Sequence, residues 1–254
     1  MATIKKNAVI SSRDRINGTS SSFYVNFPSD TRIRTFRLTR VIIKNTWYVV
    51  NATNYSVDFT ETDGADTSEA SFSLTPGNYT SSNIEVALKA GFDGATKNTR
   101  TYTVSTDNTT GFITITGSAG NFELLFGTGT NVSTTIADVI GFTSVDTTPG
   151  LSHTSTEFFE LGGLDKIFLK SNTLCPSEEG GFITSSDDAH VIGVIGLTSS
   201  YGDVQKDEPP DEPVDVYSTA PLSYCDFYLT YSNNVAVELN GSEWYFTATV
   251  LTSH

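Results

Sequence analysis

Short segments in which apolar and polar residues alternate recur along almost the whole of this 254-residue chain. Residues 23–27 alternate aromatic or branched side chains with small or polar ones and stop at Pro28, which cannot donate to a β-ladder. Residues 102–105 and 112–116 repeat the alternation on either side of a polar connection that ends in Gly111, a strong hairpin signal. A period of two predicts a fold built from antiparallel strands.

Other apolar segments extend this pattern to ten or more strands. Further strands are predicted at residues 35–51, 55–60, 70–74, 122–126, 157–161, 166–169, 191–197, 225–231 and 244–251. Thr, Val, Ile, Phe and Tyr are abundant and strong helix formers are few, which suits half-buried strands. Capping residues at 80–83 before an apolar segment, with Gly91 beyond it, predict one short helix, and residues 133–140 predict another helical turn or two. The sequence therefore predicts an all-β fold with one or two short helices.

Charge is divided unequally along the chain. The first 44 residues carry nine Lys and Arg against two acids, whereas the remaining 210 carry six against twenty-seven. Such asymmetry governs long-range association, so the two parts are expected to meet different partners. Arg32, Arg34, Arg37 and Arg40 fall on a predicted strand, where a solvated strand face accounts for at least half of them.

The four basic residues before the first predicted strand are interpreted differently. Lys5, Lys6, Arg13 and Arg15 lie in a polar segment where little would bury them. They predict an extended basic N-terminal arm over residues 1–22 that contacts an assembly partner.

Residues 23–254 are expected to form a single domain, because this length suits one large β-sandwich. The acidic segment 203–215 has three prolines and little to bury, so we expect an exposed loop within that domain. Cys175 and Cys225 have neither metal-ligand spacing nor a disulfide framework and predict reduced thiols. Since Met1 is followed by no apolar run of signal-peptide length, we expect synthesis in the cytosol and no membrane span.

Candidates for catalysis and metal binding are weak. The histidines have no partner at i+2 or i+4, and no nucleophile or phosphate-binding motif occurs. Residues 186–190 and 63–69 offer possible ligands, but a turn is the better interpretation of each because neither has the ordered spacing of a metal loop. Glu178 and Glu179 are adjacent, and consecutive carboxylates seldom face one another across a glycosidic bond. We therefore assign no catalytic, cofactor-binding or metal residues and expect neither an enzyme nor a cofactor.

Four stretches carry a resemblance to a known family. Residues 10–28, which begin Ile-Ser-Ser-Arg-Asp-Arg-Ile-Asn-Gly, resemble the start of the penton, or minor capsid, proteins of virophages, polinton-like viruses and related double-jelly-roll DNA viruses. Residues 74–80 before the predicted helix, the Thr-rich hairpin at 102–116 and the segment 136–142 resemble the internal pattern of those proteins. The matches run in order over about the first 145 residues.

The resemblance implies a single jelly-roll β-sandwich that stands upright in the capsid and forms a homopentamer at the icosahedral vertex. Its implied partners are other copies of itself, the major capsid protein and other minor capsid or spike proteins. From the position of the basic residues we expect orientation within an assembly and no nucleic acid contact. The implied location is the virion, after synthesis in the host cytoplasm. The basic arm would then contact neighbouring capsid subunits.

Two other classes of protein fit the same sequence features. A viral receptor-binding or fibre-head β-sandwich, usually a trimer, would share the Thr- and Asn-rich strands. A carbohydrate-acting jelly-roll enzyme would need facing carboxylates in an aromatic-lined groove.

Overall fold

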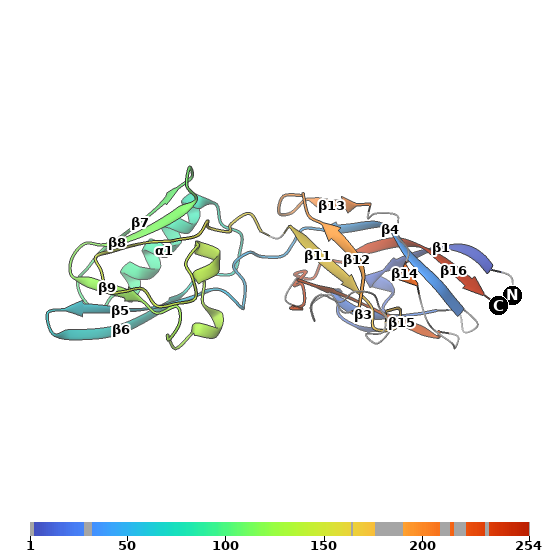
Figure 1. The fold of residues 1–254 in the computed structure, drawn as a ribbon, viewed down its shortest axis with the longest axis horizontal. Coiled ribbons are helices and arrows are strands. Elements are labelled where there is room, and N and C mark those ends of the chain that lie inside the picture. The colour runs from blue at the N-terminus through green and yellow to red at the C-terminus, as the bar shows by residue number, and fades with distance from the viewer. Residues whose placement is uncertain are drawn as a thin grey trace. The chain divides into compact units, whose positions relative to one another are not determined.

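A computed structural model describes residues 3–27, 32–163, 165–175, 190–208, 214–215, 222–231 and 234–253. Its contacts divide the chain into two compact units (Figure 1). Met1–Trp47 and Leu164–His254 together form the sandwich unit, and Tyr48–Gly163 form the inserted unit, which interrupts it in sequence. Each unit has its own apolar core. The predicted single domain over residues 23–254 is therefore wrong, because the apolar segments of that range are shared between two cores.

Two antiparallel sheets make up the sandwich unit. The first has the order β1 (Thr3–Ser11), β16 (Tyr245–Ser253), β4 (Arg32–Lys44) and β13 (Val204–Asp207), and β14 (Val214–Asp215) also pairs with β4. The second has the order β12 (Val191–Gly196), β11 (Lys166–Lys170), β15 (Tyr224–Thr230), β3 (Ser22–Asn26) and β2 (Asn17–Gly18). A 3-10 helix, η1 (Ser12–Asp14), follows β1. These sheets confirm the all-β prediction and are consistent with a jelly-roll β-sandwich.

Strand β4 illustrates how the sequence builds the core of this unit. Its fully or almost fully buried side chains are Ile33, Phe36, Leu38, Val41 and Ile43. The spacing between successive buried residues is two except at two places, from Ile33 to Phe36 and from Leu38 to Val41, where it is three. At each of these places the pairing with β16 has an irregular register. Aromatic rings from both sheets fill the space between them, with neighbouring ring centroids 5.0 to 6.3 Å apart, in the set Phe23, Phe36, Phe227, Trp244 and Phe246.

The inserted unit contains two three-stranded antiparallel sheets and a helix. One sheet has the order β6 (Asp66–Ser73), β5 (Ser56–Asp63) and β9 (Asn121–Leu124), and the other has the order β10 (Ser152–Thr154), β8 (Phe112–Gly117) and β7 (Tyr102–Asp107). The predicted hairpin at 102–116 is confirmed as β7 and β8. Two 3-10 helices, η2 (Val132–Thr134) and η3 (Ala137–Ile140), fall in the predicted second helical segment.

The predicted short helix is α1 (Ser81–Ala95). Thr80 caps it by accepting a hydrogen bond from the Asn83 N–H at 3.2 Å, and Ile84, Leu88 and Phe92 form its buried stripe. The helix continues past Gly91, where an end was expected, because Phe92 completes the buried stripe. No helix among the described residues is long and apolar enough to cross a membrane.

Two apolar segments predicted as strands have another structure. The strand predicted at 35–51 ends at Lys44, and its apolar continuation crosses from one core to the other: Trp47 packs in the sandwich core and Val50 in the inserted core. The segment 157–161 forms no strand, although Phe159 is buried in the inserted core. In both places burial, not sheet pairing, explains the apolar residues.

The predicted acidic loop at 203–215 is wrong in part. Val204–Asp207 form β13 and pair with residues 41–44 of β4, and Val214–Asp215 pair with residues 35 and 36 of the same strand. Gln205 is buried, and its side-chain oxygen is satisfied there by hydrogen bonds from the backbone N–H groups of Thr198 and Ser199, both at 3.0 Å. Residues 209–213 lie outside the described residues.

Candidate assembly surface

The segment predicted as an extended arm is largely part of the sandwich. Residues 3–11 form β1, which pairs antiparallel with β16 over its full length, from Thr3 opposite Ser253 to Ser11 opposite Tyr245. Lys5 and Lys6 therefore lie on an edge strand, with exposed side chains. A strand at the edge of a sheet needs few apolar residues, because its outer face and free edge are solvated. Removal of residues 2–15 would uncover β16, so these residues are not a dispensable arm.

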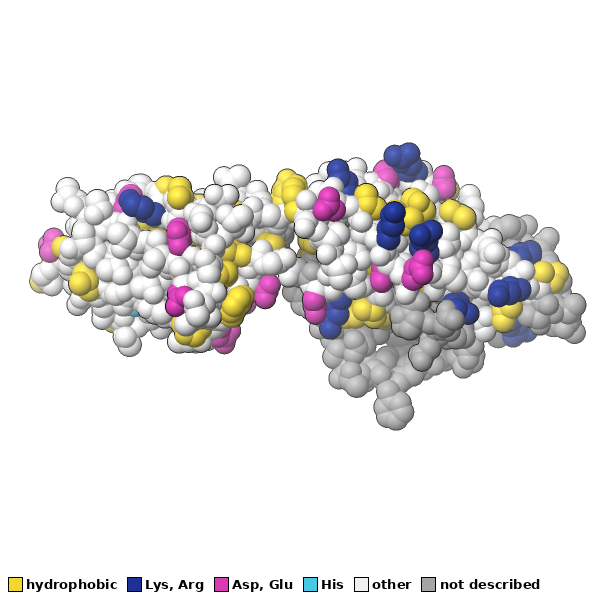
Figure 2. Space-filling model, turned by 90° about the horizontal axis from the view of Figure 1, so that it is seen from above, with side chains coloured by type: hydrophobic (Ala, Val, Ile, Leu, Met, Phe, Trp, Pro, Cys, Tyr) yellow, Lys and Arg dark blue, Asp and Glu magenta, His cyan; other side chains and the backbone are white. Residues whose placement is uncertain are grey.

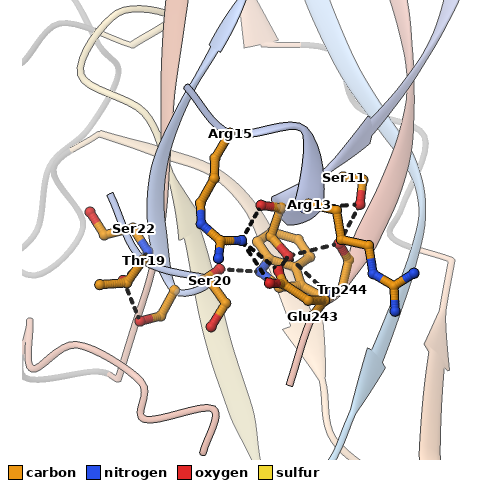
Figure 3. Close-up of polar contacts among 10 residues, drawn as sticks. Ser11, Arg13, Arg15, Thr19, Ser20, Ser22, Glu243 and Trp244 are labelled. Carbon is orange, nitrogen blue, oxygen red and sulfur yellow. Dashed lines mark hydrogen bonds and ion pairs between the residues drawn. The ribbon is translucent and has the colours of Figure 1, made fainter. Parts of the chain in front are cut away.

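Arg15 belongs to a hydrogen-bonded clamp and not to a free arm. Its Nη1 donates to Glu243 Oε1 at 2.7 Å and to the Ser12 carbonyl at 2.6 Å, and both charged side chains are about one-third exposed or less (Figure 3). The Ser12 hydroxyl also donates to Glu243. The hydrogen bond from this hydroxyl is the largest cause that lowers the pKa of Glu243 from its ordinary value. Burial raises the pKa, and the hydrogen bond from Arg15 lowers it further.

Trp244 fixes the rest of this segment to the sandwich. The Ser12 N–H donates to the Trp244 carbonyl at 3.0 Å, and the Trp244 indole Nε1 donates to the Ser20 carbonyl at 2.7 Å. The indole itself is 2% exposed and stacks on Phe246. Residues 12–22 are thus folded against the start of β16. The Ile16 N–H also donates to the Tyr24 carbonyl, and the Leu229 N–H donates to the Ser21 carbonyl.

Arg13 differs from Arg15 although only one residue separates them. Its side chain is exposed and is directed away from the Glu243 clamp (Figure 3). Of the four predicted assembly residues, Lys5, Lys6 and Arg13 therefore stay available to a partner, whereas Arg15 is engaged within the chain.

The basic residues of β4 lie on the outer face of the first sheet. Arg34, Arg40 and Lys44 are exposed, and they alternate with the buried residues of the same strand. Arg40 forms a loose ion pair with Glu208, Nε to Oε1 at 3.8 Å, and both side chains remain half exposed or more. Such a pair contributes little to stability. Lys and Arg side chains gather over the sandwich unit on the face seen in Figure 2.

Three buried carboxylates are each engaged by several donors. Asp58 accepts from the backbone N–H and the side-chain amide of Asn131, at 2.6 and 2.7 Å. Glu61, fully buried, accepts from the hydroxyls of Thr96 and Tyr102 and from backbone N–H groups at the end of α1. Asp226 accepts from Ser171, Asn172 and Thr173. Carboxylates held in this way fix loops and helix ends to the sheets.

The weaker candidates can be located only in part. Glu178, Glu179 and residues 186–189 lie outside the described residues, while His190 Nδ1 lies 2.7 Å from the Cys175 carbonyl oxygen. Residues 63–69 comprise the end of β5, the β5–β6 turn and the start of β6, and Asp63 pairs with Asp66 across the turn. Among the residues that the structure describes, no three His, Cys, Asp or Glu side chains gather as a metal site would require.

Sequence comparison gives no match to a family model and no match to a curated protein. Among solved structures, the crystal structure of selenomethionine-labelled mavirus penton protein aligns with 100% of this chain and 100% of its own, with a TM-score of 0.46 and 12% sequence identity.

Proposed function

We propose that this chain is a structural virion protein of the penton type, which forms a pentameric capsomer at the vertices of an icosahedral capsid. The observation that carries the proposal is the position of the penton-like stretches in the fold. Residues 10–28 lead from β1 through η1 to β3, and residues 74–80 lead into α1. Residues 102–116 make the β7–β8 hairpin, and residues 136–142 contain η3. The described residues of all four stretches therefore lie in strands or helices or lead directly into them.

The chemistry of the described side chains favours a structural role over an enzymatic one. A carboxylate that acts as an acid or a nucleophile must be able to reach a substrate. Asp58, Glu61 and Asp226 instead accept several internal hydrogen bonds each, and hydrogen bonding outweighs burial to lower the pKa of Glu61 and of Asp226. Such carboxylates suit a fixed scaffold.

As a penton, the chain would contact further copies of itself and the surrounding major capsid proteins, and spike proteins would attach at the same vertex. The exposed cations Lys5, Lys6 and Arg13 are the residues we assign to these contacts.

Vertex labelling of particles tests the proposed function. An epitope tag inserted at Gly64, in the exposed β5–β6 turn, leaves both cores untouched. Gold-labelled antibody against the tag should mark only the vertices, whereas antibody against the major capsid protein should mark whole particles. Label spread over the facets, or none on intact particles, contradicts the proposal.

The fibre-head alternative predicts a different subunit number. Mass photometry of the purified chain distinguishes a pentamer from a trimer by multiples of the 27.4 kDa chain mass.

A further inference from the structure

The sandwich unit has two flanks of different construction. The β1 flank consists of β1, which is an edge strand of the first sheet, and of β3 with β2 at the edge of the second sheet. The β13 flank consists of β13 and β14 at the opposite edge of the first sheet, and of β12 at the opposite edge of the second.

The β1 flank is open and apolar at its centre. A groove of about 300 Å³ lies between β1 and β3, lined by Val9, Ile10, Ile16, Val25 and Phe27 together with polar neighbours. Val9 is 71% exposed and Ile16 is 57% exposed, which is unusual for branched apolar side chains that line one groove. Among the described residues, β1 pairs only with β16, so its outer backbone edge is open as well.

The β13 flank is closed by its own side chains but presents apolar groups outward. Asp207 Oδ2 accepts a hydrogen bond from the Gly196 N–H at 3.1 Å, which ties β12 to β13. Tyr201 and Val204 are each about half exposed at this flank. These side chains are of a size and character that suit the groove of the opposite flank.

The two flanks carry opposite charge. On the β1 flank, exposed Lys5 and Lys6 lie further along β1 than the groove, and exposed Arg13 precedes Asp14, an acid that lines the groove. The β13 flank carries the exposed acids Asp203 and Glu208 against one exposed base, Lys206, and Glu208 also forms the loose ion pair with Arg40. Complementary charge across two surfaces raises the rate of association and fixes the register of docking.

The sheet register relates the height of residues on one flank to the height of residues on the other. Successive pairings across β16 and β4 put Lys5 in the same row as residue 215 of β14. They also put Ile10 in the same row as Asp207 of β13. Because each of the three pairings is antiparallel, β1 and β13 run in opposite directions. Copies related by rotation about an axis along the strands would therefore bring two antiparallel edges together at the same height.

We propose that the β1 flank of one copy docks on the β13 flank of the next copy, with Tyr201 and Val204 over the apolar groove and Lys5, Lys6 and Arg13 facing the acids. An interface between two different flanks is head-to-tail and generates a ring when the rotation closes. The inference rests on the proposed function for the fivefold closure of that ring.

Charge reversal of the full-length chain tests the interface. A variant with Lys5→Glu, Lys6→Glu and Arg13→Glu places like charges on both flanks, so its self-association in sedimentation experiments should weaken at least about 100-fold. Addition of Asp203→Lys and Glu208→Lys to the same chain should restore association, which also shows that the variants fold. Lys97→Glu in the inserted unit is the matched control and should leave association unchanged.

Two exposed valines test the apolar groove. Val9→Glu should abolish association, whereas Val86→Glu on α1, where the valine is 68% exposed, should not. A wild-type chain that stays monomeric at high concentration, equal association of the charge-reversed variant, or failure of the second charge set to restore it would overturn the proposed interface. These readouts are independent of particle labelling: association with the expected variant pattern but without vertex label rejects only the proposed function, and vertex label without that pattern rejects only the interface.

Discussion

Asp226 shows how a single buried carboxylate holds a loop to the sandwich. Its side chain is 5% exposed and accepts hydrogen bonds from the backbone N–H groups of Asn172 and Thr173, at 2.9 and 2.8 Å, and from their side chains. Burial alone would raise the pKa of Asp226, but these donors outweigh it and hold the pKa below its ordinary value. The residues after β11 are thereby fixed to β15.

Replacement of this carboxylate should change both stability and its dependence on pH. Asp226→Asn puts an amide N–H₂ opposite backbone donors, and we expect a loss of roughly 3 kcal/mol in the free energy of unfolding at pH 7. Because the pKa of Asp226 is lower in the folded state than in the unfolded state, the ionised carboxylate contributes its full stabilisation above about pH 4. That stabilisation is lost as the pH falls through the folded-state pKa. Urea unfolding between pH 7 and pH 3 should therefore show a smaller acid destabilisation in Asp226→Asn than in wild type. Asp14→Asn, at an exposed position, is the control, and equal acid sensitivity of all three proteins would contradict the assignment.

Elements with strong local sequence signals could be predicted more reliably than the polar edge strands β1 and β13. The β7–β8 hairpin and α1 follow from local signals: period-two alternation around a polar turn, and a capping residue before an apolar stripe. β1 and β13 could not be predicted in this way, because an edge strand buries only part of one face and its polar residues resemble a loop. The consecutive apolar residues Val9 and Ile10 were the available sequence signal for β1. The Arg15–Glu243 clamp could not be predicted, since its partners are 228 residues apart.

Two glycines in α1 test how closely this helix packs on β6. A methyl group on Gly91 would lie 2.2 Å from the Phe72 ring, whereas one on Gly94 would have no atom within 4 Å. Gly91→Ala should therefore destabilise the protein by about 1–3 kcal/mol through overpacking. Gly94→Ala should stabilise it by about 0.5–1 kcal/mol, because alanine loses less backbone entropy in a helix. Chemical denaturation of both variants measures the difference, and a similar change in the two would show that α1 does not pack on Phe72 as described.

At the scale of the whole molecule, the division of charge follows the two units more closely than it follows the N-terminal segment. The inserted unit has thirteen acidic residues against three basic ones, whereas the sandwich unit has sixteen against twelve. The basic N-terminal residues are thus one part of a sandwich with charge of both signs. The strongly acidic part of the chain is a contiguous segment with its own core.

This contiguity predicts that residues 48–163 fold as a separate polypeptide. The two ends of the segment are adjacent, since a methyl group on Gly163 would lie 3.4 Å from Val49 Cγ2, and every residue of its core comes from within the segment. Its length is that of an ordinary small domain, and its net negative charge favours solubility. We expect a single cooperative unfolding transition by circular dichroism, at a temperature close to that of one transition in the full chain. Phe59→Ala, which opens the aromatic core around Phe92, should lower that temperature in both the segment and the full chain. A segment that unfolds without cooperativity would mean that the inserted unit depends on the sandwich for its structure.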